Sequence, residues 1–338
     1  MVLCAKVERK NAEKARQRLV SAGVFDGSFV PAHDEGFVYF AIKGKIPGIT
    51  TAQKNLAKRS AQGKSLYDEL KGNLTAAELN ELVTSFDIVG DIAVVEIPPA
   101  LVKREKLIAE VILKNHKNVK TVAKKTGGTA GEFRIRPVKV IAGEKKTWTI
   151  YRESGCKFEL DLNKTYFSPR LGTERARIAE LVKPKELVLV PFAGVGPFAI
   201  AIGKAVPSAR VVGIELNPDA AEYFKRNVVR NKCTNLTAIC GDVAKLLPGK
   251  YKGKASRAIM PLPKDAGRFL ANAIPCLKKG GMLHYYSFGD ARSPFAKAEE
   301  EVIEAAAKFG RKARVIFRRV VRPYSKEVEQ VVVDAKVD

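Results

Sequence analysis

The second half of the chain alternates between short apolar runs and amphipathic segments. Apolar or alternating runs predict seven strands there, at 187–192, 209–216, 236–242, 256–263, 282–288, 313–320 and 329–337. Amphipathic helices are predicted in most of the gaps, as at 218–231 and 266–277. This alternation is typical of a mostly parallel sheet with helices on both faces. Only a short loop separates the last two runs, so they should form an antiparallel pair.

The first half of the chain predicts smaller α/β units. Helical spacing predicts a helix over 10–22 whose buried face holds Ala12, Ala15, Leu19 and Val20. A strand is expected at 36–42, and a further strand-like run at 86–98 precedes a basic helix from Pro99 to about His116. A basic, glycine-rich loop is expected at 117–133. We therefore expect an N-terminal domain at 1–50, a basic linker at 51–65, a middle domain at 66–145 and a larger domain at 146–338.

The balance of charge changes this picture, because it suggests a partner. The chain has 60 Lys and Arg against 36 Asp and Glu, a net charge of +24. Such an excess favours nucleic acid, since a polyphosphate gains affinity by releasing counterions, although it could serve solubility alone. Charge does not separate DNA from RNA. A phosphate-tracking face, or simply a solvated helix flank, is predicted where eight cations crowd together: Lys103, Arg104, Lys106, Lys114, Lys117, Lys120, Lys124 and Lys125.

Several classes of protein do not fit the sequence. No run of 18 apolar residues predicts a membrane span, and the first residues lack a signal-peptide layout. The five cysteines are widely spaced and form no C-x-x-C pair, so we expect neither disulfides nor a zinc site. The expected compartment is the reducing cytoplasm. The three histidines stand far apart, which argues against any metal.

One stretch has the features of a cofactor site. The strand predicted at 187–192 leads through Gly194-x-Gly196 into a helix opened by Pro197. Glycines let a ligand approach the backbone, and the helix N-terminus should face the carboxyl ends of the strands, where ligands bind in open sheets. The next two strands end in Glu215 and Asp242, positioned to accept hydrogen bonds from a ribose and an adenine.

The same stretch distinguishes between two cofactors. A dinucleotide fingerprint needs a third glycine, but Pro197 and Phe198 follow Gly196 here. S-adenosylmethionine has no pyrophosphate to cradle, so the pattern favours that cofactor. Acids that merely end two strands remain the alternative for Glu215 and Asp242.

Five motifs make the chain resemble the archaeal tRNA (guanine-37-N1)-methyltransferases. They are GEFRIR (131–136), YFSPRLGTERARI (166–178), FAGVGPF (192–198), ELNPDA (215–220) and LHYYSF (283–288). The resemblance covers nearly the whole chain, and SPRLGTERAR is its most specific block. It implies an α/β fold with a class I, Rossmann-like core on a seven-stranded, mostly parallel sheet. It also implies a monomer in which the N-terminal domain reads the tRNA elbow while the other domains hold the anticodon stem-loop.

The resemblance also implies roles for individual residues. Glu174 would be the general base, and Arg134 would contact the target guanine. The implied substrate-lining residues are Tyr166, Arg170, Arg175 and Pro263. The implied S-adenosylmethionine contacts are Phe192, Gly194, Gly196, Glu215, Leu216, Asp242, Val243 and Pro261. No metal is implied.

Elementary chemistry is consistent with these roles. Guanine N1 carries a proton and is a poor nucleophile, so a carboxylate can remove that proton while an arginine stabilises charge at O6. A flipped nucleotide in a loop would suit the reaction. The residues alone permit plainer readings, namely a helix-terminal ion pair for Glu174 and Arg175, and phosphate binding for Arg134. At least one of Tyr285 and Tyr286 should pack in the core rather than stack on a base.

The sequence departs from the family at two positions. Pro261 stands where the family has asparagine, and Val190 stands where it tends to have an acid. Proline offers neither an amide side chain nor an N–H, so a contact is lost. Three alternatives therefore stay open: aminocarboxypropyl transfer in wybutosine synthesis at the same tRNA position, a catalytically silent tRNA-binding homologue, and a DNA or protein methyltransferase.

Overall fold

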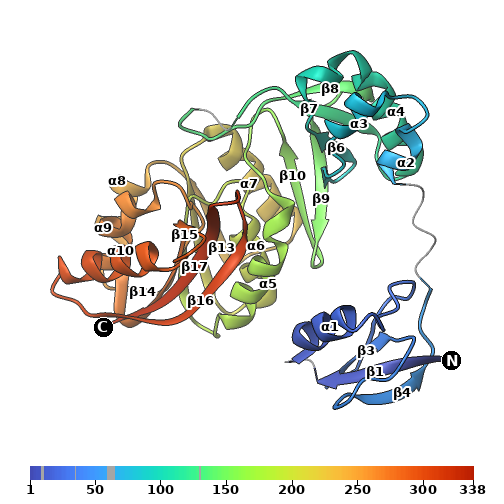
Figure 1. The fold of residues 1–338 in the computed structure, drawn as a ribbon. Helices are drawn as coiled ribbons and strands as arrows, with labels where there is room; N and C mark the ends of the chain where they lie inside the picture. The colour runs from blue at the N-terminus through green and yellow to red at the C-terminus, as the bar shows by residue number, and fades with distance from the viewer. Residues whose placement is uncertain (9–10, 35, 59–64, 129–130) are drawn as a thin grey trace. The chain divides into compact units, whose positions relative to one another are not determined.

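The computed structural model describes residues 1–8, 11–34, 36–58, 65–128 and 131–338. The chain forms two compact units, Met1–Gly72 and Asn73–Asp338 (Figure 1). The first unit is an antiparallel sheet in the order β2-β3-β1-β4, with helix α1 (Ala12–Ser21) packed on it. Its strands are β1 (Val2–Glu8), β2 (Ala32–His33), β3 (Phe37–Ala41) and β4 (Thr50–Lys54), and the short helix α2 (Leu66–Leu70) ends the unit.

Two predictions for this unit need correction. Ala15 and Leu19 lie on the buried face of α1 as expected. Val20 is 52% exposed, because it lies at the side of the apolar stripe. The predicted linker at 51–65 begins too early. Thr50–Lys54 form strand β4, which pairs with β1, and a further bridge joins Phe29 to Lys58. Polar threonines pair well at a sheet edge, so polarity alone misled the prediction. Most of the remaining linker, 59–64, lies outside the described residues.

The second unit begins with a four-stranded sheet in the order β5-β6-β7-β8. The predicted run at 86–98 is a hairpin, in which β5 (Asp87–Val89) turns at Gly90 into β6 (Ile92–Val95). A 3-10 turn (Pro99–Arg104) leads into α4 (Glu105–Asn115), which covers the sheet, and α3 (Ala76–Asn80) precedes them. The predicted loop at 117–133 was wrong in its centre, because β7 (Thr121–Lys125) is a strand between β6 and β8 (Val138–Gly143). In the sequence, lysines flank the short buried part of β7, so the strand did not stand out as an apolar run.

The remainder of the second unit is built on a seven-stranded sheet in the order β13-β12-β11-β14-β15-β17-β16. The pairs among the first five are parallel, and the last two strands, β16 and β17, form the predicted antiparallel pair; β17 is also antiparallel to β15. The strands are β11 (Leu187–Pro191), β12 (Arg210–Glu215), β13 (Leu236–Cys240), β14 (Ala255–Met260), β15 (Leu277–Asp290), β16 (Ala313–Pro323) and β17 (Val328–Val337).

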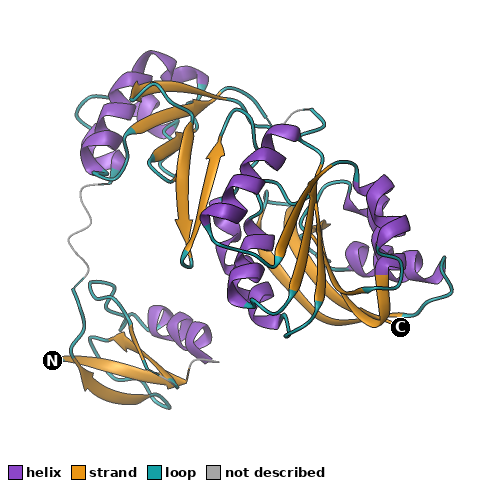
Figure 2. Cartoon of the chain, turned by 180° about the vertical axis from the view of Figure 1, so that it is seen from behind, coloured by secondary structure: helices purple, strands orange, loops and turns teal. Residues whose placement is uncertain are grey.

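Helices cover both faces of this sheet, and each face has its own hydrophobic core (Figures 1 and 2). One face carries α5 (Gly172–Leu181), α6 (Pro197–Ala205) and α7 (Pro218–Arg230). The other carries α8 (Val243–Lys250), α9 (Leu270–Ala273) and α10 (Ala296–Ala307). The helix predicted at 266–277 is instead α9 flanked by two 3-10 turns, Ala266–Phe269 and Ile274–Cys276. A hairpin that the alternation did not predict, β9 (Trp148–Glu153) and β10 (Cys156–Asp161), precedes the sheet.

Within the part of the chain that the structure describes, no helix is both long enough and apolar enough to cross a membrane.

Candidate active site

The glycine turn lies at the carboxyl end of β11. Phe192, Gly194 and Gly196 all have positive φ, at 60°, 57° and 89°, and Gly196 then caps α6. A Cβ on Gly196 would lie 2.1 Å from the ring of Phe224 in α7, so only glycine fits there. Gly194 meets nothing closer than the carbonyl oxygen of Tyr166, at 3.8 Å. Phe224 therefore packs against the turn at Gly196, whereas the backbone of Gly194 is uncovered on the side that faces Tyr166.

Glu215 fastens this turn to the end of β12. Its Oε2 accepts a hydrogen bond from the N–H of Gly194 at 2.7 Å, and its Oε1 accepts one from the N–H of Asn217 at 2.8 Å. Burial raises the pKa of Glu215, while the backbone donors partly oppose that shift. Asn217 caps α7 by accepting from the N–H of Asp219 at 3.0 Å. The predicted ribose acid thus lies against the glycine turn.

The other predicted cofactor contacts lie at the same carboxyl end of the strands. Asp242 caps α8, accepting from the N–H of Ala244 at 2.8 Å. Leu216 is exposed beside Glu215, whereas the side chain of Val243 is buried in the core, so only its backbone could face a ligand. An open glycine turn, a helix N-terminus and acids at two neighbouring strand ends fit the methionine, ribose and adenine parts of S-adenosylmethionine.

The predicted base, Glu174, lies in the first turn of α5 and is only 2% exposed. Its Oε2 accepts hydrogen bonds from Nε of Arg177 and from the hydroxyl of Tyr286, both at 3.0 Å. Its Oε1 is buried without a hydrogen bond, and Nη1 of Arg319 lies 3.2 Å away. The ring of Tyr286 contacts Phe198 in the first turn of α6, the helix that follows the glycine turn.

A chain of buried polar groups continues from Glu174 along the face of the sheet that α5 covers. Arg177 reaches Asp334 at 2.6 Å, Asp334 contacts Nδ1 of His284 at 2.7 Å, and Nε2 of His284 lies 2.6 Å from Arg257. Burial lowers the pKa of His284, so the ring is neutral and accepts from Arg257 through Nε2. Burial alone would raise the pKa of Asp334, but bonds from His284 and Arg177 hold it below its usual range. The chain therefore fixes Arg177, and Arg177 fixes one oxygen of Glu174.

Arg134 joins the middle sheet to the loop that follows β14. Its backbone has a φ of 55°, and its guanidinium donates to the carbonyl of Lys264 and pairs with Asp265 at 2.9 Å. Arg134 therefore contacts the loop that begins with Pro261 and Pro263 directly after β14. Its guanidinium is held by the carbonyl of Lys264 and the carboxylate of Asp265 in that loop.

The remaining predicted substrate residues lie in different settings. Tyr166 is 44% exposed and borders the glycine turn, so its ring is available. Arg170 pairs with Asp87 of β5 at 2.7 Å. Arg175 is buried, binds Glu153 through Nε at 2.7 Å and donates to the carbonyl of Ser168 through Nη1 at 3.2 Å. Substrate contact by Arg175 stays a prediction, and these bonds favour a positioning role.

Several residues of the site were missed in the sequence. Arg177, Tyr286 and Arg319 surround Glu174, and Asp265 holds Arg134. One signal was present, because Glu174 and Arg177 stand three apart, a spacing that places two side chains on one face of a helix. Tyr285 and Tyr286 are both buried, so the expected core packing applies to each of them.

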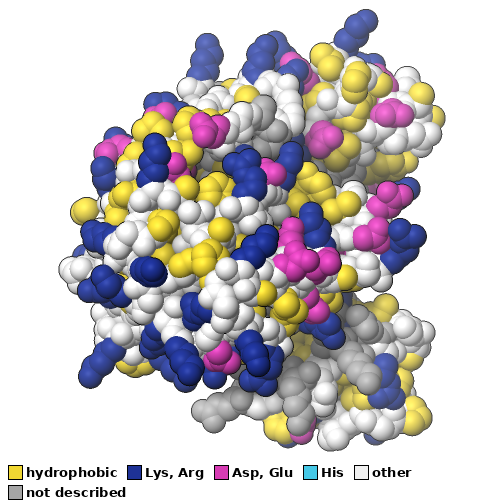
Figure 3. All heavy atoms as spheres, turned by 90° about the vertical axis from the view of Figure 1, so that its left-hand side faces the viewer, with side chains coloured by type: hydrophobic (Ala, Val, Ile, Leu, Met, Phe, Trp, Pro, Cys, Tyr) yellow, Lys and Arg dark blue, Asp and Glu magenta, His cyan; other side chains and the backbone are white. Residues whose placement is uncertain are grey.

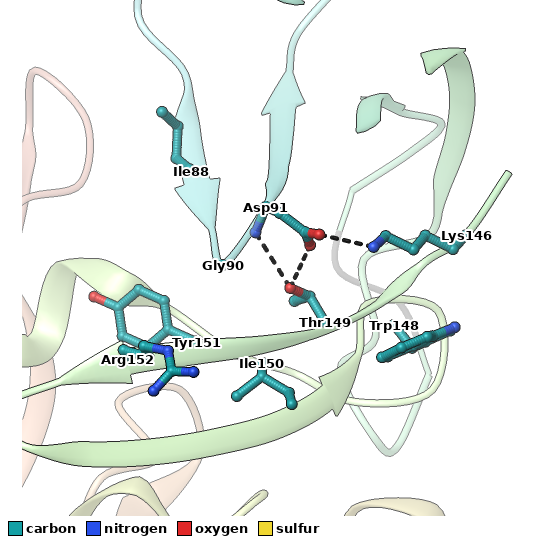
Figure 4. Close-up of a pocket in the computed structure, with 9 residues that line it drawn as sticks. All are labelled: Ile88, Gly90, Asp91, Lys146, Trp148, Thr149, Ile150, Tyr151 and Arg152. Carbon is teal, nitrogen blue, oxygen red and sulfur yellow. Dashed lines mark hydrogen bonds and ion pairs between the residues drawn. The ribbon is translucent and has the colours of Figure 1, made fainter. Parts of the chain in front are cut away.

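A hollow of about 490 Å³ lies between the β5–β6 turn and β9 (Figure 4). There Asp91 accepts from the hydroxyl of Thr149 at 2.7 Å and pairs with Lys146 at 2.7 Å, beside the exposed Trp148. None of the predicted site residues lines it. These bonds fasten the middle sheet to the β9–β10 hairpin. Over the described ranges, no group of three or more His, Cys, Asp or Glu is arranged to hold a metal ion.

The fold and the site define a class I methyltransferase that uses S-adenosylmethionine. Comparison with known proteins agrees. Residues 149–316 match the TRM5/TYW2 methyltransferase domain, residues 66–147 the TYW2 N-terminal domain, and residues 4–50 the tRNA methyltransferase 5 N-terminal domain. The chain belongs to the archaeal tRNA (guanine-37-N1)-methyltransferase family.

The relatives span the whole chain. It is 38% identical to the tRNA (guanine(37)-N(1))-methyltransferase Trm5b of Pyrococcus abyssi, covering 100% of this chain and 99% of the relative. The crystal structure of P. abyssi Trm5b superposes with a TM-score of 0.74 over 100% of both chains. The structure of aTrm5 with tRNALeu has a TM-score of 0.72 at 30% identity, covering 99% of this chain and 100% of that one.

A relative with another activity matches less of the chain. The tRNA(Phe) (4-demethylwyosine(37)-C(7)) aminocarboxypropyltransferase of Methanocaldococcus jannaschii is 33% identical over 70% of this chain and 94% of its own length.

Proposed function

We propose that this protein transfers a methyl group from S-adenosylmethionine to N1 of guanosine 37 in tRNA. The observation that carries the proposal is the position of Glu174, a buried carboxylate whose Oε1 accepts no hydrogen bond and which is joined through Tyr286 to Phe198, in the helix that follows the glycine turn. The full-length similarity to Trm5b supports the same conclusion. The protein would act in the cytoplasm as a monomer, with no obligate protein partner.

Each part of the site has one task in this proposal. When bound, the cofactor supplies a methyl group that its sulfonium has already activated. Glu215 would hold the ribose, Asp242 would face the adenine, and the bare turn at Gly194 would leave room for the methionine end. Glu174 would take the proton of guanine N1, and Arg134 would stabilise negative charge at O6.

The tRNA would meet a strongly basic surface. Lys and Arg side chains are spread over the face seen in Figure 3, with fewer acids between them. Of the eight cations predicted to track phosphates, Arg104, Lys124 and Lys125 pair with acids of their own domain, so the full cluster is not available to RNA. We propose the domain division given by the sequence, except that the N-terminal domain extends past Lys54 and the linker begins after it.

Aminocarboxypropyl transfer is the second candidate, because Pro261 alters the loop beside Arg134. Against it, the segment 4–50 matches the tRNA methyltransferase 5 N-terminal domain, and the aminocarboxypropyl relative matches only 70% of this chain. The intact SPRLGTER block argues the same way.

Product mass separates the candidates. The protein would be incubated with S-adenosylmethionine and unmodified tRNA transcripts that carry guanosine or adenosine at position 37, followed by nucleoside mass analysis. We expect N1-methylguanosine from the guanosine transcript alone. A heavier adduct would assign aminocarboxypropyl transfer, and tRNA binding without product would indicate a silent homologue.

A further inference from the structure

The two oxygens of Glu174 have different partners. Oε2 is held by two groups that cannot easily leave, since Arg177 is also tied to Asp334 and the Tyr286 ring is buried. Oε1 has no hydrogen bond although it is buried. Its one close charged partner among the described residues is an arginine that makes an ion pair without a hydrogen bond, so this oxygen is held less firmly than Oε2.

Arg319 is the partner that faces Oε1. It lies on the edge strand β16, its Nη1 is 3.2 Å from Oε1, and its side chain is 42% exposed. Among the described partners of this carboxylate, it is the exposed one. It can therefore leave Oε1 without breaking the buried network that fixes Oε2.

We propose that Oε1 is the basic oxygen and that Arg319 is its positioning residue, paired with Oε1 in the free enzyme and transferred to an RNA phosphate when the guanine arrives. This inference rests on the proposed function, in which Glu174 is the base. The proton of guanine N1 moves to Oε1, which becomes a neutral carboxylic acid and later returns the proton to water.

The charges around Glu174 explain why such an exchange would help. Arg177 from α5 and Arg319 from β16 face the carboxylate, together with the neutral Tyr286 from β15, and Asp334 from β17 stands behind Arg177. Two contacting arginines compensate the buried negative charge of Glu174. Moving Arg319 away uncovers Oε1 at the moment the proton must be taken. A phosphate is a strong partner for a freed guanidinium.

The test uses pH profiles, because kcat/KM reports the free enzyme and kcat reports the enzyme–tRNA complex. Arg319→Gln should move the acid-limb midpoint of kcat/KM to higher pH and should leave the midpoint of kcat in place. It should also lower the salt slope of tRNA binding by roughly 0.7–0.9, the loss of one phosphate contact. Arg319→Lys, which keeps the charge, should restore most of the wild-type profile.

The neighbouring Arg318→Gln is the matched control, because Arg318 is exposed on the same strand but pairs with Glu299 on α10. It should leave both midpoints unmoved. Equal shifts in kcat and kcat/KM for Arg319→Gln would mean that Arg319 stays on Glu174 in the complex, and would overturn the exchange. No shift in either would overturn the positioning role. If Glu174→Gln keeps the wild-type acid limb, the base role in the proposed function fails, and that outcome is distinct from both.

Discussion

Replacing Gly196 with alanine should damage both stability and cofactor binding. An alanine there must adopt a φ of +89°, which costs about 1–2 kcal/mol for an L-residue. Its Cβ would also lie 2.1 Å and 2.3 Å from two ring carbons of Phe224, a fully buried side chain that cannot swing away. Overpacking of this kind costs typically about 1–3 kcal/mol. The expected loss in the free energy of unfolding is therefore about 2–5 kcal/mol.

The control for this substitution is Gly310→Ala, because Gly310 also has a positive φ, of 66°, but has nothing within 4 Å of the added Cβ. It should show only the conformational part, about 1–2 kcal/mol. Urea unfolding measures both variants, and calorimetric titration measures binding of S-adenosylmethionine. Adding Phe224→Leu to Gly196→Ala should recover part of the loss. The reasoning fails if Gly196→Ala is no less stable than Gly310→Ala and binds the cofactor normally.

Three further predictions follow from contacts of the site. Burial raises the pKa of Glu215, and ribose hydroxyls donate to its ionised form, so affinity for S-adenosylmethionine should fall as the pH drops through that raised pKa. Glu215→Gln should bind weakly at all pH values. Calorimetry from about pH 5 to pH 8 measures both. Arg134→Ala and Asp265→Asn should slow single-turnover methylation non-additively, with a coupling of about 0.5–1 kcal/mol for this half-exposed pair, and strict additivity would count against the contact. Arg175→Met should lower the free energy of unfolding by about 3–5 kcal/mol by stranding the carboxylate of Glu153, and a Glu153→Leu, Arg175→Met double variant should regain most of it in urea unfolding.

The parallel sheet could be predicted from the sequence because its strands are apolar, evenly spaced and separated by amphipathic helices. All seven predicted strands exist within a few residues of their expected bounds. The strands that were missed have weaker patterns. In β7 three small buried residues lie between lysines, and in β4 polar residues pair at a sheet edge. In both, tertiary pairing rather than local hydrophobicity decides the structure.

The site was predictable where a motif combines backbone geometry with a fixed spacing. The glycine turn, Glu215 and Asp242 meet at one sheet edge because parallel strands end together. Partners brought from distant segments could not be foreseen. Arg319 and Asp265 reach Glu174 and Arg134 across more than a hundred residues each, and no local pattern records such pairs. Arg175 is the opposite case. The motif that contains it was recognised in the sequence, but the motif did not indicate that its side chain is buried against Glu153.

The most direct test of the account is the single-turnover rate of methyl transfer to tRNA carrying guanosine 37, compared between the wild type and Glu174→Gln, with tRNA affinity measured on the same samples. The glutamine keeps the size of the side chain and its bonds from Arg177 and Tyr286, but it cannot accept the proton. The account predicts a loss of about 10²-fold or more in rate with tRNA affinity nearly unchanged. An unchanged rate, or a loss that lies wholly in binding, would contradict it.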